Sequence, residues 1–274
     1  MTVTIGSLLE TAPVPRMDAR ILLSFVTGET RESQIAHGEH ALNREHVARF
    51  RELCAQKAAG VPVAYLTGRA WFYRREFLVN DRVMIPRPET EELVEEAVAY
   101  LRSSRTRRVV DAGTGSGAIA CTIAAEVPMA RVDAIDVSAE ALEVARQNAI
   151  TLGVADSVQL FHCSVGEFRP RGRYDAIVAN LPYVPSAALP RKPASAGFEP
   201  PIALDGGADG LDHYRVLLAR APQLLRGGGL LLMEAASETA EPLRALAARE
   251  CAGSAAIVHA DYSGRPRYVA LLAA

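Results

Sequence analysis

Short apolar runs alternate with longer amphipathic runs through the second half of the chain. Runs of strand length occupy residues 108–112, 131–136, 158–163, 174–179, 230–234, 256–260 and 268–272. Between them, apolar residues recur at helical spacing over residues 117–126, 139–152, 212–225 and 238–250. This alternation predicts an α/β fold, with a mostly parallel sheet and helices on both of its faces.

The N-terminal part of the chain has a helical pattern instead. Apolar residues recur at helical spacing over residues 18–26, and Gly28 follows, as is typical of a helix C-terminus. A second helix is predicted over residues 43–59, because Asn43 is a suitable N-cap. No strand is predicted before Val63.

A third pattern separates these two regions. Residues 71–85 combine aromatic and apolar pairs with Arg-Arg and Asn-Asp steps, which predicts a short hairpin or an extended linker. Pro-Arg-Pro-Glu-Thr at 86–90 then precedes a helix whose acidic run indicates a solvated face. The predicted division is a helical substrate-recognition domain at 1–70, a hairpin or linker at 71–85 and an α/β domain at 86–274.

Composition and charge disfavour several partners. The 274 residues carry 30 basic and 32 acidic side chains, and a net charge of -2 disfavours a nucleic-acid-binding protein. No apolar run approaches the ~20 residues of a membrane span. The N-terminus lacks the basic and apolar regions of a signal peptide. We therefore expect a cytoplasmic protein with no membrane partner.

Cysteine and histidine spacing gives no sign of a metal centre. The four cysteines are scattered without a CxxC pair, and no HExxH motif is present. Buried thiols in a reducing compartment are the favoured interpretation. We expect no metal.

A glycine-rich turn follows the first strand of the α/β region. Residues 109–117 have the sequence Val-Val-Asp-Ala-Gly-Thr-Gly-Ser-Gly, which predicts a strand, a tight turn and a helix N-terminus with unpaired N–H groups. About twenty residues later the next strand ends in a carboxylate that can accept both hydroxyls of a ribose. These features predict an adenosine-containing cofactor held by Gly113, Thr114, Gly115, Ser116, Gly117 and Asp136.

Two features favour S-adenosylmethionine over a dinucleotide, although the glycine pattern also satisfies the relaxed dinucleotide fingerprint. Asp111 precedes the glycines, where a carboxylate can pair with the ammonium of a methionine moiety but would face a pyrophosphate badly. An Asn-Leu-Pro-Tyr sequence follows the fourth strand, where a methyl acceptor is needed. A missing Gly-Lys-Ser/Thr excludes a P-loop, and a missing Gly-x-Ser-x-Gly disfavours a hydrolase.

That tetrapeptide offers groups suited to a planar NH2. Asn180 can accept through Oδ1 and donate through Nδ2. Pro182 favours an extended Leu181, whose carbonyl would turn outward as a second acceptor, and Tyr183 adds a ring face. The four residues are the predicted catalytic set, with Asn180 also facing the cofactor. The alternative interpretation is a strand-end turn with a packing tyrosine.

Residues 185–209 are long for a connection, which favours a substrate loop.

At these residues the chain resembles the HemK/PrmC-type protein-(glutamine-N5) methyltransferases, which modify peptide-chain release factors. The resemblance covers nearly the whole chain, and its motifs lie at 18–23, 62–68, 85–91, 109–117, 136–138, 199–207, 209–211 and 261–265. It implies an N-terminal helical bundle and a Rossmann-like, seven-stranded class I methyltransferase domain whose last strand is antiparallel. It also implies methyl transfer from S-adenosylmethionine to a glutamine amide of a class I release factor, with S-adenosylhomocysteine as product.

The chain departs from the family pattern at two places. The family has Asn-Pro-Pro-Tyr, and Leu181 here keeps the carbonyl acceptor but adds an N–H. Ser164 and Val165 stand where the family commonly has an Asp and an aromatic residue beside the adenine, so Val165 is expected to contact the cofactor. These departures favour a divergent paralogue. Two alternatives stay open: an amino methyltransferase acting on adenine N6 of a nucleic acid, and a non-catalytic protein that kept the fold.

Overall fold

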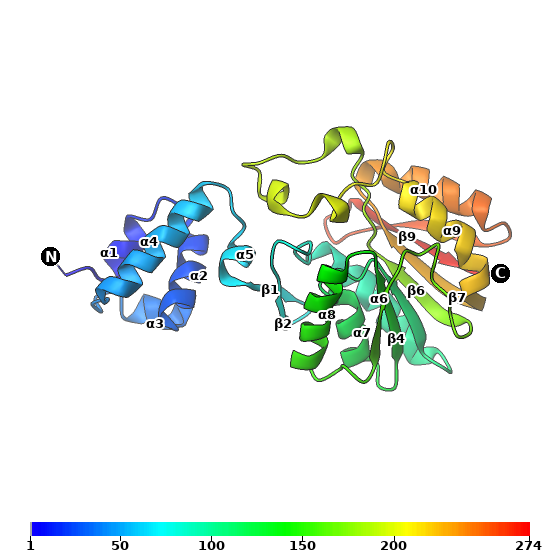
Figure 1. Cartoon of the computed structure of the whole chain (residues 1–274), viewed down its shortest axis with the longest axis horizontal. Helices are drawn as coiled ribbons and strands as arrows, with labels where there is room; N and C mark the ends of the chain where they lie inside the picture. Colours follow the sequence, from blue (N-terminus) through cyan, green and yellow to red (C-terminus); the bar gives the residue numbers. More distant parts are fainter. Residues whose placement is uncertain (1) are drawn as a thin grey trace. The chain divides into compact units, whose positions relative to one another are not determined.

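The computed structural model describes residues 2–274, which form two compact units (Figure 1). The first unit contains the chain up to Arg69 together with Pro190–Phe198. The second contains Ala70–Leu189 and Glu199–Ala274. The sequence placed a boundary at residue 70, but nothing in it indicated that part of the long loop belongs with the N-terminal unit.

The first unit is a small helical bundle. The two helices predicted from periodicity are present as α2 (Arg16–Thr27) and α4 (Arg44–Ala58). Their ends follow the expected signals: Gly28 is left-handed with φ 75°, and the Asn43 side chain accepts from the His46 N–H at 2.7 Å. Three further helices have only five or six residues, too few for a periodic signal; they are α1 (Ile5–Glu10), α3 (Arg31–Ala36) and α5 (Val63–Thr67).

The long loop contributes a segment to this bundle at a glycine. The Ser195 hydroxyl donates to the Gly60 carbonyl at 3.2 Å. A Cβ at Gly60 would overlap the Pro193 carbonyl, and its φ is +99°. Only glycine permits both this backbone conformation and this close approach.

A hairpin opens the second unit. Strands β1 (Arg69–Phe72) and β2 (Arg75–Leu78) form a two-stranded sheet. The two residues between them, Tyr73 and Arg74, have φ values of 48° and 62°, as a type I′ turn requires. The Asn148 side chain accepts from the Leu78 N–H at 2.7 Å and donates to its carbonyl at 3.0 Å. The hairpin is thereby fixed to the helix that carries Asn148.

The second unit is built on a seven-stranded sheet with the order β5-β4-β3-β6-β7-β9-β8. The central strands are parallel, and β9 runs antiparallel to both of its neighbours, as the family resemblance implied. The strands are β3 (Arg108–Ala112), β4 (Arg131–Asp136), β5 (Val158–His162), β6 (Tyr174–Ala179), β7 (Leu225–Glu234), β8 (Ala255–Ala260) and β9 (Pro266–Leu272).

Helices cover both faces of this sheet (Figure 1). One face carries α6 (Glu89–Ser103), α7 (Ala118–Glu126) and α8 (Ala139–Thr151). The other carries α9 (Asp212–Leu224) and α10 (Ser237–Glu250). Short 3-10 turns interrupt the long loop at Ser186–Ala188, Ser195–Phe198 and Pro201–Ala203. The predicted α/β architecture is confirmed.

Two sequence expectations need correction. Strand β7 begins at Leu225, earlier than the predicted 230, because Leu225 pairs with Tyr174 ahead of the glycine run. The acidic run of α6 is also more than a solvated face. Its carboxylates accept hydrogen bonds from the Tyr73 N–H at 2.9 Å and from the hydroxyls of Tyr262 and Tyr268. These bonds tie the helix to the hairpin and to the chain around β9.

All four cysteines are free thiols, and only Cys163 is partly exposed. Within residues 2–274, none of the helices combines the length and the apolar character that crossing a bilayer demands.

Candidate active site

A cavity of about 270 Å³ lies at the carboxyl ends of β3, β4 and β6. The strand order reverses between β3 and β6, and ligands of open α/β sheets bind at such a point. The lining comes from the glycine turn, the ends of β4 and β6, the linker before α6, the loop after β5 and the long loop. Its members include Phe72, Met84, Pro86, Thr90, Gly113, Thr114, Gly115, Ser116, Asp136, Val165, Asn180, Leu181, Pro182, Ile202 and His213.

The glycine turn packs directly against the Asn-Leu-Pro-Tyr sequence. The N–H groups of Gly113 and Thr114 both donate to the Ile135 carbonyl, at 2.9 and 3.0 Å, and anchor the turn to β4. A Cβ at Gly113 would lie 2.9 Å from Leu181 Cδ2, whereas one at Gly115 would meet nothing within 4 Å. The turn therefore contacts Leu181 on one side and leaves open space at Gly115 for a ligand.

Asp136 lines the cavity at the position predicted for ribose recognition. Its Oδ2 accepts from the Gly115 N–H at 2.8 Å, and its Oδ1 accepts from the Ser138 N–H at 2.9 Å. Burial raises the pKa of this carboxyl, and the two backbone bonds oppose that rise. Each carboxylate oxygen accepts more than one hydrogen bond, so both keep acceptor capacity for a ligand hydroxyl.

Asp111 is fully buried and does not line the cavity. Its Oδ2 accepts from the Thr114 hydroxyl at 2.6 Å and from the Ala120 N–H at 3.0 Å, which joins the glycine turn to α7. Its Oδ1 has no hydrogen-bond partner among the described residues. Burial raises the pKa of Asp111 to about 7. A direct contact with a cofactor ammonium stays a prediction.

The extra N–H of Leu181 has a buried partner. It donates to the Tyr214 hydroxyl at 3.3 Å, and that hydroxyl in turn donates to the Glu234 backbone carbonyl. The Leu181 carbonyl lies 3.4 Å from the same hydroxyl. The departure from the family tetrapeptide is thus accommodated by a tyrosine of α9, which satisfies a donor that proline would lack.

The predicted site residues separate into two groups. Those of the glycine turn from Gly113 to Ser116 line the cavity, together with Asp136, Val165, Asn180, Leu181 and Pro182. Asp111, Gly117 and Tyr183 do not. Gly117 begins α7 with φ 79°, and a Cβ there would lie 3.1 Å from Ala145. The Tyr183 hydroxyl donates to Glu234 at 3.3 Å.

Sequence reasoning missed two polar residues beside Asn180. Thr90 is the last residue of the Pro-Arg-Pro-Glu-Thr sequence, which predicts only the approach to a helix, and it lines the cavity. Glu234 was considered only as the end of a strand, and its carboxylate is buried behind Thr90 and Tyr183. The Pro-Arg-Pro-Glu-Thr sequence was a signal for Thr90, whereas Glu234 had none beyond its place at a strand end.

An ion pair joins the two most specific sequence motifs. Arg87 of Pro-Arg-Pro-Glu-Thr pairs with Glu199, which opens the Glu-Pro loop. The Glu199 side chain is 1% exposed, so burial raises its pKa and the Arg87 guanidinium opposes that rise. The pair holds the long loop near the linker that lines the cavity.

The loop after β5 carries the second departure from the family. Cys163, Ser164 and Val165 all line the cavity. The Ser164 hydroxyl donates to Glu167 at 2.6 Å. This wall of the cavity therefore presents a serine hydroxyl that already donates to Glu167, at the place where the family commonly has an aspartate.

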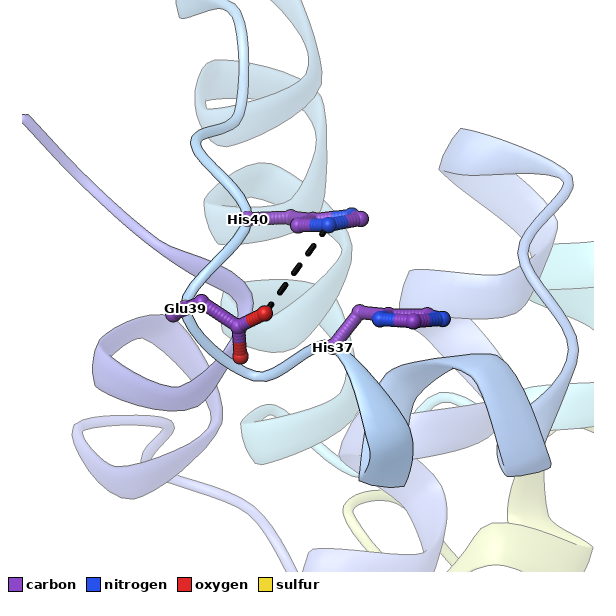
Figure 2. A group of neighbouring side chains, drawn as sticks. All are labelled: His37, Glu39 and His40. Atoms are coloured by element: carbon purple, nitrogen blue, oxygen red, sulfur yellow. Dashed lines mark ion pairs between the residues drawn. The ribbon is translucent and has the colours of Figure 1, made fainter.

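Among residues 2–274, one group of side chains has the composition of a potential metal site, and it lies in the first unit. Figure 2 shows His37, Glu39 and His40, whose ligand atoms lie within 4.8 Å of one another. All three are exposed, and the imidazole rings are stacked with centroids 4.6 Å apart and planes 7° apart. Lone pairs in parallel ring planes do not converge on one point, so this group is not a preformed metal site.

Comparison with known proteins agrees with this architecture. A family model described as PrmC N-terminal domain matches residues 4–68, and one described as methyltransferase small domain matches residues 92–192. A "SAM Dependent Methyltransferase" from Agrobacterium tumefaciens is a structural neighbour with a TM-score of 0.52 and 18% identity, covering 74% of this chain and 69% of that one. A "ribosomal protein L11 methylase" from Lactobacillus delbrueckii subsp. bulgaricus has a TM-score of 0.51, 18% identity and coverage of 70% and 82%. The second unit has the Rossmann-like fold of class I S-adenosylmethionine-dependent methyltransferases.

Sequence relatives define the family. A release factor glutamine methyltransferase from Moorella thermoacetica is 44% identical over 256 residues, covering 92% of this chain and 89% of the relative. One from Xylella fastidiosa strain 9a5c is 41% identical over 240 residues, covering 86% of each chain. The chain belongs to the release factor glutamine methyltransferase family, which confirms the resemblance drawn from its motifs.

Proposed function

We propose that the chain transfers a methyl group from S-adenosylmethionine to the side-chain amide nitrogen of a glutamine in a class I peptide-chain release factor. The observation that carries the proposal is the hydrogen bonding of the Asn180 side chain at the cavity wall. Its Nδ2 donates to Thr90 Oγ1 at 3.2 Å, while its Oδ1 receives no hydrogen bond from residues 2–274. An acceptor of fixed direction is therefore available for a substrate NH2.

The cavity has the features that the cofactor needs. Open space at Gly115 permits close approach to the backbone, and the Asp136 carboxylate keeps acceptor capacity for ribose hydroxyls. Val165 and Ile119 supply apolar lining suited to a purine. The volume of about 270 Å³ lies just below the range of about 300–1,000 Å³ that is typical of small-molecule sites. When bound, S-adenosylmethionine supplies an electrophilic methyl group on a sulfonium.

An amide nitrogen is a weak nucleophile, and residues of the chain can position it and stabilise the charge that develops on it. Its nitrogen lone pair is delocalised into the carbonyl, so positioning and charge stabilisation must supply most of the rate. Asn180 Oδ1 and the Leu181 carbonyl can each accept one N–H of the substrate amide. Both would stabilise positive charge as it develops on nitrogen. Held at the glycine turn and Asp136, S-adenosylmethionine would supply the methyl group by exchange of its S–C bond for the new N–C bond, with S-adenosylhomocysteine as product. The amide nitrogen would release one proton to water.

The target is supported by the relatives. Those from Moorella thermoacetica and Xylella fastidiosa carry release factor glutamine methyltransferase as their names and match nearly the full chain. The near-neutral charge gives no electrostatic reason for a nucleic-acid substrate. The helical first unit matches the PrmC N-terminal domain, and we assign it to binding of the protein substrate.

The test replaces Asn180 with Ala and measures transfer of radiolabelled methyl to a purified class I release factor, with mass spectrometry of the labelled peptide. We expect label on one glutamine amide in the wild type and a loss of about 100-fold or more in the variant, as for removal of one transition-state hydrogen bond. The affinity for S-adenosylmethionine, measured by calorimetry, should stay within a few fold.

Gln147→Ala serves as the matched control, because it removes an exposed carboxamide of α8. It should leave turnover unchanged. Unimpaired turnover in the Asn180 variant would refute the role of this side chain. Label that appears in nucleic acid, with none in the release factor, would favour the adenine-directed alternative, and absence of cofactor binding would favour a non-catalytic protein.

A further inference from the structure

A chain of hydrogen bonds connects the ends of β7 and β6 through α6. The Thr90 hydroxyl donates to Glu234 Oε2 at 2.6 Å, and Asn180 Nδ2 donates to Thr90 Oγ1 at 3.2 Å. The two inner members are buried, with exposures of 4% for Thr90 and 1% for Glu234. The bond between Thr90 and Glu234 is therefore shielded from water, whereas the bond between Asn180 and Thr90 is partly buried at the cavity wall.

The direction of each bond in this chain follows from the number of protons available. An ionised carboxylate only accepts, so the single proton of the Thr90 hydroxyl is committed to Glu234. The hydroxyl oxygen can then only accept from its other neighbour. The neighbouring carboxamide must present its NH2 group to Thr90, and its carbonyl oxygen consequently faces away.

We propose that Thr90 and Glu234 are positioning residues, which fix the Asn180 carboxamide with Oδ1 toward the substrate amide. The inference rests on the proposed function, because it explains how that function obtains its acceptor. Without the chain, the carboxamide could rotate by half a turn and present its NH2 to the substrate NH2. Two donors would then oppose each other, and the hydrogen bond that stabilises charge on nitrogen would be lost.

The charge of Glu234 is the origin of this direction. Burial raises the pKa of its carboxyl, and hydrogen bonds and a nearby arginine oppose the rise. The groups that face it are Thr90 and Glu89 of α6, Tyr183 after β6, Tyr214 of α9 and Arg267 of β9. Arg267 is itself paired with Asp261 at 3.0 Å, so the positive charge nearest Glu234 is shared.

Protonation of Glu234 would reverse the chain. A neutral carboxyl can donate to Thr90, which frees the threonine proton to bond Asn180 Oδ1. Turnover should therefore be full where Glu234 is ionised and should fall as the pH drops through its pKa. Because that pKa is raised, the loss should occur at a higher pH than for an ordinary glutamate.

The experiment compares Thr90→Val, which keeps the shape without the hydroxyl, with Thr90→Ser, which keeps the hydroxyl. We expect kcat for the release factor to fall about 10- to 100-fold in Thr90→Val, equivalent to one buried hydrogen bond, and to be largely retained in Thr90→Ser. The affinity for S-adenosylmethionine should change less than about threefold in both, since Thr90 has no place in the ribose or glycine-turn contacts. Equal kcat in wild type and Thr90→Val would overturn the inference.

A second readout needs no turnover. In 15N-labelled protein, the side-chain NH2 signals of Asn180 are identified by their absence in Asn180→Ala. We expect these signals to be protected from solvent exchange, to lose protection in Thr90→Val, and to change with pH at the same midpoint as kcat. In Glu234→Gln, whose amide can donate to Thr90, the pH-dependent change should disappear. Signals that are unprotected in the wild type, or unaltered in both variants, would contradict the inference.

The two readouts also separate this inference from the function on which it rests. If the wild type labels no glutamine while the Asn180 signals behave as described, the orientation is right and the proposed substrate is wrong. If the wild type labels glutamine and the Thr90 variants match it, the function stands and the positioning role fails.

Discussion

Exchange of Leu181 for proline would restore the family tetrapeptide and remove one N–H from the site. In this chain that N–H donates to the Tyr214 hydroxyl at 3.3 Å, in a setting where both residues are buried. The Leu181→Pro variant therefore loses a hydrogen bond that family members with proline never had. Its carbonyl remains, so we expect methyl transfer to be retained within a few fold.

The size of the stability loss depends on which buried group each substitution leaves without a hydrogen-bond partner. In Tyr214→Phe, the Leu181 N–H stays buried without an acceptor, at a cost of about 1–3 kcal/mol. The Glu234 backbone carbonyl also loses a donor in this variant. In the Leu181→Pro background, residue 181 has no N–H that the tyrosine exchange could leave unpaired. In that background, Tyr214→Phe should lower the free energy of unfolding by about 1 kcal/mol less than it does in the wild type. The effects of the two substitutions on stability are therefore non-additive.

Native-state hydrogen exchange of β6 measures these free energies without mixing the two units. All six residues of this strand are buried, so their amides report the opening of the second unit. Tyr262→Phe is the matched control, since its hydroxyl is exposed and bonded to Glu95, and it should be additive with Leu181→Pro. Additivity of Leu181→Pro and Tyr214→Phe within about 0.5 kcal/mol would refute the assigned hydrogen bond.

Two further outcomes are expected. The double variant Ser164→Asp/Glu167→Gln places a carboxylate in the cavity wall after β5 and removes a neighbouring like charge. Its calorimetric Kd for S-adenosylmethionine should be several fold lower than that of Glu167→Gln alone. An unchanged or higher Kd would contradict the importance of position 164 for cofactor binding. Burial raises the pKa of Asp111 to about 7 from 3.8, so the folded chain keeps a proton that the unfolded chain releases. The stability of the wild type relative to Asp111→Asn should therefore fall as the pH rises from about 4 to 7, by at most about 1.4 kcal/mol per pH unit, and then level off. Urea unfolding at several pH values checks this, and a difference that does not vary with pH would show that Asp111 is ionised throughout.

The elements that the sequence predicted best are those whose signals are local. The strands at 108–112, 131–136 and 174–179 have the predicted bounds, because each is a short apolar run that ends in a turn or a glycine. The helices α1, α3 and α5 were missed because they are too short to show a period. The length of residues 185–209 predicts a substrate loop. No local pattern shows that the segment 190–198 lies beside Gly60, because that contact joins residues more than a hundred positions apart.

For the candidate site, the sequence alone determined the chemical groups and the edge of the sheet to which they belong. A glycine turn, an acid at the next strand end and an Asn-x-Pro-Tyr sequence are read from neighbouring residues, and parallel strands place their carboxyl ends together. Only the tertiary structure decided that Asp111 lies inside the protein and that Leu181 finds Tyr214. It also decided that Thr90 and Glu234 stand behind Asn180. These facts depend on side chains from β7, α6 and α9, and hydrogen-bond direction is a property of such an assembled network that no local pattern encodes.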